Sequence, residues 1–107
     1  MTPPAIGVTL IIRIDLFTPD RGGRATPIRS GYRPLCVVNQ PDGGEVVIGL
    51  CELQLSEQLR PGDSGEGRLS FSVEVSQEVR SLLGVGSRFT LAEGRRPIGS
   101  AEVRGID

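Results

Sequence analysis

The chain has 107 residues, which is enough for one domain with a single hydrophobic core. Its formal net charge is -1, so no overall field draws it to nucleic acid or to anionic lipid, and any basic function must be local. It contains no histidine and no lysine, which excludes histidine-based nucleophile pairs, and two cysteines alone cannot complete a zinc site.

The N-terminal segment MTPPAIGVTLIIRIDLF predicts a strand rather than a signal peptide, because Arg13 and Asp15 interrupt its apolar run. Apolar residues alternate with more polar positions, as in a half-buried strand, at Val8, Leu10, Ile12, Ile14 and Leu16. No segment approaches the roughly 18 apolar residues of a membrane helix. We therefore expect a cytoplasmic protein without a membrane partner and, since it begins with Met1, a complete short one.

The next two expected strands, residues 34–39 (PLCVVN) and 45–55 (EVVIGLCELQL), are joined by the turn PDGG at 41–44. Antiparallel pairing across this turn puts Cys36 and Cys51 on neighbouring strands, diagonal rather than opposite. Diagonal neighbours are further apart than a disulfide prefers, so we expect two buried free thiols.

Residues 68–75 (RLSFSVEV) predict a further strand, with Leu69, Phe71, Val73 and Val75 on one face. Residues 77–83 (QEVRSLL) allow only a short helical turn, and two more strands are expected at 87–93 and 97–106. Turns rich in glycine and proline separate these strands. The pattern indicates an all-β fold, either a sandwich or a closed barrel.

No catalytic or nucleotide-binding signature is evident. No carboxylate lies beside a base, no serine lies in a GxSxG turn, and a chain without lysine cannot complete a P-loop. We therefore expect no enzymatic activity, no cofactor and no metal.

Two arginine-bearing loops are the candidate sites: GGRATPIRSGYRP at 22–34, with Arg21, Arg24, Arg29 and Arg33, and the last turn, with Gly94, Arg95 and Arg96. If the loops converge, they could bind a phosphate backbone or an acidic protein. If they project separately, their charges only keep the turns solvated. Tyr32 is similarly open to two interpretations, a stacking surface for a base or an anchor for its own loop.

Four motifs, in this order, resemble the C-terminal β-barrel domain (domain III) of bacterial elongation factor Tu. GGR with Pro27, then GYRP at 31–34, is similar to the family's GGRHTPF and GYRPQF. PGD at 61–63 precedes a strand ending in VEV, and RFTLAEGRRPIGSAEV at 88–103 is similar to the family's RFAIREGGRTVGAGVV. The resemblance extends from about residue 8 to residue 103.

The resemblance implies a closed antiparallel barrel of about six strands that has no catalytic role. In the family this barrel contacts the GTPase domain, the nucleotide-exchange factor and the T-stem of aminoacyl-tRNA. The positions of the tRNA surface that this chain retains are Arg24, Arg33 and Gly94. The positions where it departs from that surface are Ala25, Leu35 and Gln77, which replace a histidine, a glutamine and a lysine. These replacements remove phosphate or sugar contacts, so tRNA binding is expected to be weak.

Two functions of different classes follow. The first is a translation-related binding module for tRNA or for a protein of the translation machinery, and the second is a protein-interaction adaptor or mimic of elongation factor Tu without RNA binding. The predicted contact residues are Arg24, Arg29, Arg33, Gly94, Arg95 and Arg96. The residues predicted to shape the loop are Gly22, Gly23, Pro27, Gly31, Tyr32 and Pro34.

Overall fold

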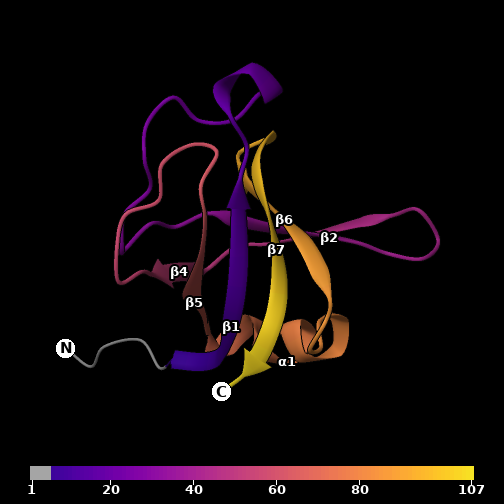
Figure 1. Cartoon of the computed structure of the whole chain (residues 1–107). Coiled ribbons are helices and arrows are strands. Elements are labelled where there is room, and N and C mark those ends of the chain that lie inside the picture. Colours follow the sequence, from indigo (N-terminus) through magenta and orange to yellow (C-terminus); the bar gives the residue numbers. More distant parts are fainter. Residues whose placement is uncertain (1–5) are drawn as a thin grey trace.

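The computed structural model describes residues 6–107. Seven strands form one antiparallel sheet in the order β3-β2-β6-β7-β1-β5-β4 (Figure 1). The elements are β1 (Ile6–Leu16), the 3-10 helix η1 (Pro19–Arg21), β2 (Leu35–Asn39), β3 (Glu45–Ile48), β4 (Cys51–Gln54), β5 (Ser64–Ser72), α1 (Val73–Leu82), β6 (Arg88–Glu93) and β7 (Arg96–Ile106). The expected all-β class is confirmed.

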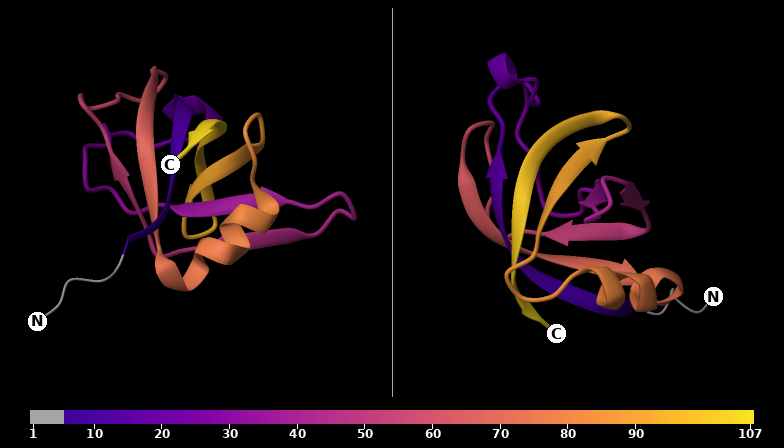
Figure 2. Two further views of the ribbon diagram at one scale, coloured as in Figure 1. Left: turned by 90° about the horizontal axis from the view of Figure 1, so that it is seen from below. Right: turned by 90° about the vertical axis from the view of Figure 1, so that its right-hand side faces the viewer.

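The sheet curls around its inner face, and the core fills the space inside the curl (Figure 2). β1 supplies alternate buried side chains over its whole described length, as its sequence pattern predicts: Val8, Leu10, Ile12, Ile14 and Leu16. Helix α1 lies across one open end and packs against β1 and β5. The backbone N–H of Val8 donates to Oγ of Ser76 at 2.9 Å, which ties this helix to β1.

The expectation of a closed barrel is wrong, since the seven-stranded sheet of the described residues is not closed. The edge strands β3 and β4 do not pair, although only Gly49 and Leu50 separate them in the chain. Leu50 has φ of 56°, a left-handed conformation that turns the backbone sharply. The single strand expected at 45–55 is therefore two strands, which lie at opposite edges of the sheet.

This corner also corrects the expected placement of the cysteines. Cys36 lies in β2 opposite Ile48 of β3, whereas Cys51 lies in β4 opposite Phe71 of β5. The two residues are thus not on neighbouring strands. Both are buried free thiols, as expected, and the Cys51 Sγ–H donates to the carbonyl oxygen of Pro34 at 3.1 Å.

The strand expected at 68–75 ends earlier, and the expected helical turn is longer. β5 stops at Ser72, where its pairing with Ile6 of β1 ends, and the next residues form the ten-residue helix α1. Val73 is 58% exposed and does not continue the inward face of the strand. Core contacts instead recur at helical spacing, at Val75, Val79, Leu82 and Leu83. No helix in residues 6–107 is long and apolar enough to cross a membrane.

Candidate functional site: two arginine-bearing loops

The loop 22–34 follows η1 and begins with a tight glycine pair. Gly22 has φ of 86° and donates its N–H to the carbonyl of Pro19 at 3.0 Å. Gly23 lies so close to the residues that follow β1 that a Cβ atom there would be 2.2 Å from the carbonyl oxygen of Phe17. The GG pair is thus required by the backbone path, which supports its predicted structural role.

The Arg24 side chain is mostly buried, and its guanidinium group bonds to other parts of the protein. Its guanidinium pairs with Glu93 at the end of β6, and it donates to Oγ1 of Thr26 at 2.9 Å and to the Thr26 carbonyl at 3.2 Å. The same guanidinium lies over the ring of Tyr32, 5.1 Å from the ring centre. Its side chain is 22% exposed. These groups, together with the Pro27 carbonyl, compete with any external ligand for this arginine.

Tyr32 anchors the loop onto the barrel-like sheet. Its ring packs against the core, and its carbonyl accepts the N–H of Leu53 at 2.8 Å. The hydroxyl is buried without a hydrogen-bond partner among residues 6–107. Burial, followed by the neighbouring Glu93 carboxylate, raises the pKa of Tyr32, while Arg24 acts in the opposite direction. Of the two interpretations, the structure supports the loop anchor.

Arg96 joins the second loop to the first. Its Nε donates to the carbonyl of Gly22 at 2.9 Å, and a terminal nitrogen donates to the carbonyl of Gly23. Together with the Arg24–Glu93 pair, these bonds bring the start of loop 22–34 and the β6–β7 turn together at one end of the sheet. Within that turn Gly94 has φ of 59°, and Arg95 is exposed.

The remaining predicted arginines are open to solvent. Arg29 and Arg95 have no carboxylate within ion-pair distance in the described part of the chain. Arg33 approaches Glu52 at 3.8 Å, but the Arg33 side chain is 78% exposed, so this pair is weak. Arg21, in η1 directly before the loop, is exposed as well. Together with Arg29, Arg33 and Arg95 it is one of the cations that an external anion can reach from the two loops.

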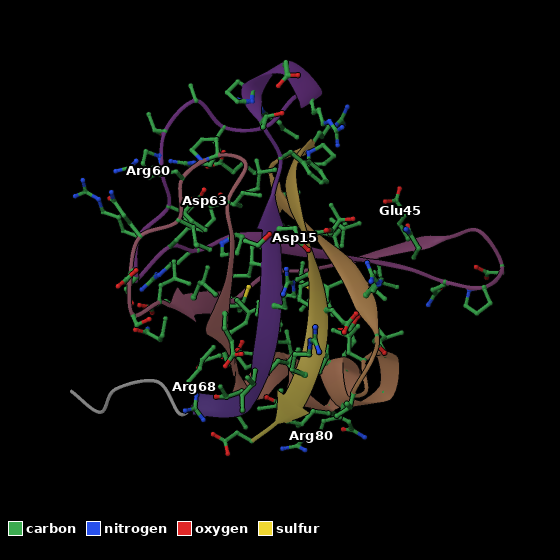
Figure 3. The ribbon with its side chains drawn as sticks, viewed as in Figure 1. Asp15, Glu45, Arg60, Asp63, Arg68 and Arg80 are labelled. Carbon is green, nitrogen blue, oxygen red and sulfur yellow. The ribbon has the colours of Figure 1, made fainter. Side chains whose placement is uncertain are left out.

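Arg60 joins this group, although the sequence pattern did not single it out. The preceding residue, Leu59, exchanges two backbone hydrogen bonds with Ile28, which places Arg60 beside the segment that carries Arg29. Figure 3 shows Arg60 and Asp63 on this side of the molecule, whereas Arg68 and Arg80 lie at the end near α1. The sequence could have indicated Arg60 as a contact residue, because it directly precedes the PGD turn, which is one of the four motifs of the resemblance.

The other predicted loop residues shape the backbone. Gly31 has φ of 94° and donates its N–H to the Leu53 carbonyl at 2.7 Å, while Pro34 is buried. The carbonyl of Pro27 accepts a bond from Arg24 at 3.4 Å. Positions that depart from the family's tRNA surface are scattered: Ala25 is exposed in the loop, Leu35 is half-buried in β2, and Gln77 is exposed on α1.

The described residues offer no further reactive centre. No group of three or more histidine, cysteine or carboxylate side chains in residues 6–107 is arranged to hold a metal ion. Burial raises the pKa of the Cys51 thiol to about 11 and also raises that of Cys36, so both thiols stay protonated at neutral pH. Neither of these two thiols lies in the arginine-bearing loops.

Comparison with known proteins agrees with the resemblance that the motifs indicate. No family model matches the chain. It is 30% identical over 95 residues to "Elongation factor Tu 2" of Streptomyces avermitilis, and the match covers 89% of this chain but 22% of that protein. The chain thus spans less than a quarter of the relative's length. Nearly all of its sequence is similar to a segment of elongation factor Tu, and its curled antiparallel sheet is compatible with the barrel domain of that factor.

Proposed function

We propose that the chain is a non-catalytic binding module of the bacterial cytoplasm that works with the translation machinery and binds RNA backbone, tRNA in particular. The observation that carries this proposal is the arrangement of the two loops. Arg24 and Arg96 use their guanidinium groups to join the two loops to each other and to β6, whereas the exposed side chains of Arg29, Arg33, Arg60 and Arg95 make no such bonds among the described residues. A rigid loop that presents planar guanidinium groups suits phosphate oxygens, which accept two bonds from each arginine.

The number of exposed arginines sets the expected strength and salt dependence. Four contacts to duplex phosphates give a slope of about -3.6 in log K against log salt, because each contact releases close to one counterion. Between 50 and 200 mM salt, this slope corresponds to a loss of affinity of about 150-fold. The overall charge of -1 adds no attraction of its own. Weak binding with a steep salt dependence is the expected behaviour.

A fluorescence-anisotropy titration with labelled tRNA at 50, 100 and 200 mM salt tests the RNA proposal. The triple variant Arg29→Ala, Arg33→Ala and Arg95→Ala should lose binding and most of the salt slope. The matched control is Arg80→Ala, which removes an exposed arginine from α1, at the other end of the molecule, and should leave binding unchanged. Absence of tRNA binding by the wild-type chain at 50 mM salt would refute the RNA proposal.

A second candidate is a protein-interaction adaptor that binds an acidic protein surface without RNA. It is favoured by the internal use of Arg24 and Arg96, together with the replacements at Ala25, Leu35 and Gln77. Fewer phosphate contacts matter less to a partner that recognises the shape of the sheet and loops. Affinity capture from a bacterial lysate with the wild type, the triple variant and Arg80→Ala would test this candidate. A translation protein captured by the wild type and Arg80→Ala, but not by the triple variant, would support it, and equal capture by all three would contradict it.

A further inference from the structure

Strand β3 pairs with β2 on one side, and no other strand of residues 6–107 pairs with its second edge. The turn between β2 and β3 is closed by hydrogen bonds from the Gln40 N–H to the Gly44 carbonyl at 2.7 Å and from the Gly43 N–H to the Gln40 carbonyl at 3.0 Å. Pairs in an antiparallel ladder alternate between bonded and non-bonded, so Val46 and Ile48 bond to β2 while Glu45 and Val47 do not. The N–H and carbonyl groups of Glu45 and Val47 therefore point away from the sheet.

Exposed apolar side chains accompany this edge. Val47 is 57% exposed and Leu50 is 62% exposed, although Leu50 also holds a left-handed conformation that is unfavourable for leucine. Val73, 58% exposed, lies close to Leu50 because the N–H of the preceding Ser72 donates to the Leu50 carbonyl at 3.0 Å. The protection of the β3 edge is limited to its four-residue length and Glu45: it carries no proline, arginine or bulge, and its unpaired backbone groups can accept a further strand. Figure 1 shows the hairpin projecting from the body of the sheet, where a partner can reach it.

We propose that two copies of this chain associate through their β3 strands, which pair antiparallel about a two-fold axis at Val47. In this register Val47 bonds to Val47 of the second copy, and Glu45 bonds to Gly49 of the second copy. Gly49 directly follows β3, and the same alternation turns its backbone groups outward. The outward-pointing groups are then on odd-numbered residues in both copies, so the edge is complementary to itself. The two sheets become one continuous sheet across the axis.

The charge pattern allows this self-pairing. Between Arg33 and Arg60 all the charged residues are acidic: Asp42, Glu45, Glu52 and Glu57. The proposed register places Glu45 opposite a glycine, and the two Glu45 residues lie four strand positions apart, about 13 Å. That separation exceeds the Debye length of about 8 Å at physiological salt. Salt should therefore leave the association unchanged or strengthen it, whereas a basic peptide bound at the same edge would dissociate as salt rises.

The first experiment is sedimentation velocity combined with amide hydrogen exchange by NMR. A four-residue edge buries less than a standard interface, so we expect monomer at about 10 µM and dimer at about 1 mM. On concentration, the amides of Glu45 and Val47 should become protected, while those of Val46 and Ile48 are protected throughout. A monomer at about 1 mM, or protection of Glu45 and Val47 that does not depend on concentration, would overturn the proposal.

The second experiment uses a substitution that removes only the outward N–H. Val47→Pro deletes the central donor of the proposed interface, yet this N–H makes no bond to β2, so the hairpin should remain intact. The dissociation constant should rise at least about tenfold. Val85→Thr changes a valine that is also mostly exposed but lies outside the patch, and it should have no effect. If circular dichroism shows that Val47→Pro is unfolded, Val47→Arg replaces it, since it places two like charges at the axis. Unchanged association in the folded Val47 variant, or equal loss in Val85→Thr, would refute the β3 interface.

Discussion

Replacing Arg24 with alanine should destabilise the fold by about 2–4 kcal/mol, a large loss for a residue that the sequence places in a surface loop. The main part comes from the Arg24–Glu93 pair, in which the two side chains are 22% and 34% exposed. A hydrogen bond between charged groups contributes about 1.5–3 kcal/mol net, and the guanidinium over the Tyr32 ring adds about 0.5–1 kcal/mol. The bonds to Thr26 add little, because they are exposed to water.

Urea denaturation at pH 7, with the m-value checked for each variant, measures this loss. Arg29→Ala is the matched control, since Arg29 lies in the same loop with no ion pair among residues 6–107, and it should change stability by no more than about 0.5 kcal/mol. A double-mutant cycle with Glu93→Gln should give a coupling energy within about 0.5–3 kcal/mol. If Arg24→Ala costs no more than Arg29→Ala, the internal role of Arg24 is wrong. The same result decides how RNA-binding experiments are interpreted. Arg24→Ala would weaken RNA binding by disturbing the loop, even if Arg24 does not contact the RNA.

Three further predictions concern the backbone and the buried thiols. Gly23→Ala should cost at least about 2 kcal/mol, because the new Cβ would meet the Phe17 carbonyl, whereas Gly84→Ala has open space and should stay within about 0.5 kcal/mol in the same assay. At dilute protein concentration, Leu50→Asn should raise the free energy of unfolding by about 0.5 kcal/mol, and Leu50→Val should lower it by about 1 kcal/mol. The reason is that asparagine tolerates the left-handed conformation of residue 50 and valine does not. The opposite order would contradict the strain assigned to Leu50. Burial raises the pKa of Cys51 from 9.0 to about 11, so the folded state holds this proton more tightly than the unfolded state. The stability from this thiol is complete below pH 9 and declines as pH rises toward 11; a melting temperature that is constant between pH 8 and pH 11 would refute it.

Local patterns predicted the strands and the hairpin well, because short-range chemistry determines them. The alternation from Val8 to Leu16 gave the buried face of β1, and the PDGG turn gave the β2–β3 hairpin. The same alternation misled at Val73 and Val75, where apolar residues continue at every second position after the pairing partners of β5 have ended. The helical spacing of Val75, Val79 and Leu82 was present in the sequence and was the better guide.

The corner at Gly49 and Leu50 was missed for a different reason. A glycine within a strand pattern indicates a bend, but nothing local shows that the two halves will lie at opposite edges of a sheet. Closure depends on the curvature of all seven strands together. The sequence therefore predicted a barrel-like all-β fold but not its open seam.

The candidate site was also predictable only in part from the sequence. The loop glycines and the arginine clusters could be recognised from residue types. Which arginines are used internally could not, because Arg24 meets Glu93 across 69 residues of sequence and Arg96 meets Gly22 across 74. Such pairings depend on the final path of the loop over β6 and β7, which only the assembled sheet determines.

The distribution of strand pairing has a consequence for local stability. β1 pairs over eight positions with β5 and seven with β7, whereas β2 meets β6 over only three, from Leu35 to Val37. The pairing of β2 with β6 is thus the shortest contact between β2 and the rest of the sheet, and the amides that bond across it should exchange through openings of lower free energy than those of β1. A partner that binds the attached β2–β3 hairpin would stabilise the short pairing between β2 and β6. Because β6 ends at Glu93, the added stability would extend to the turn that holds Glu93 and Arg96.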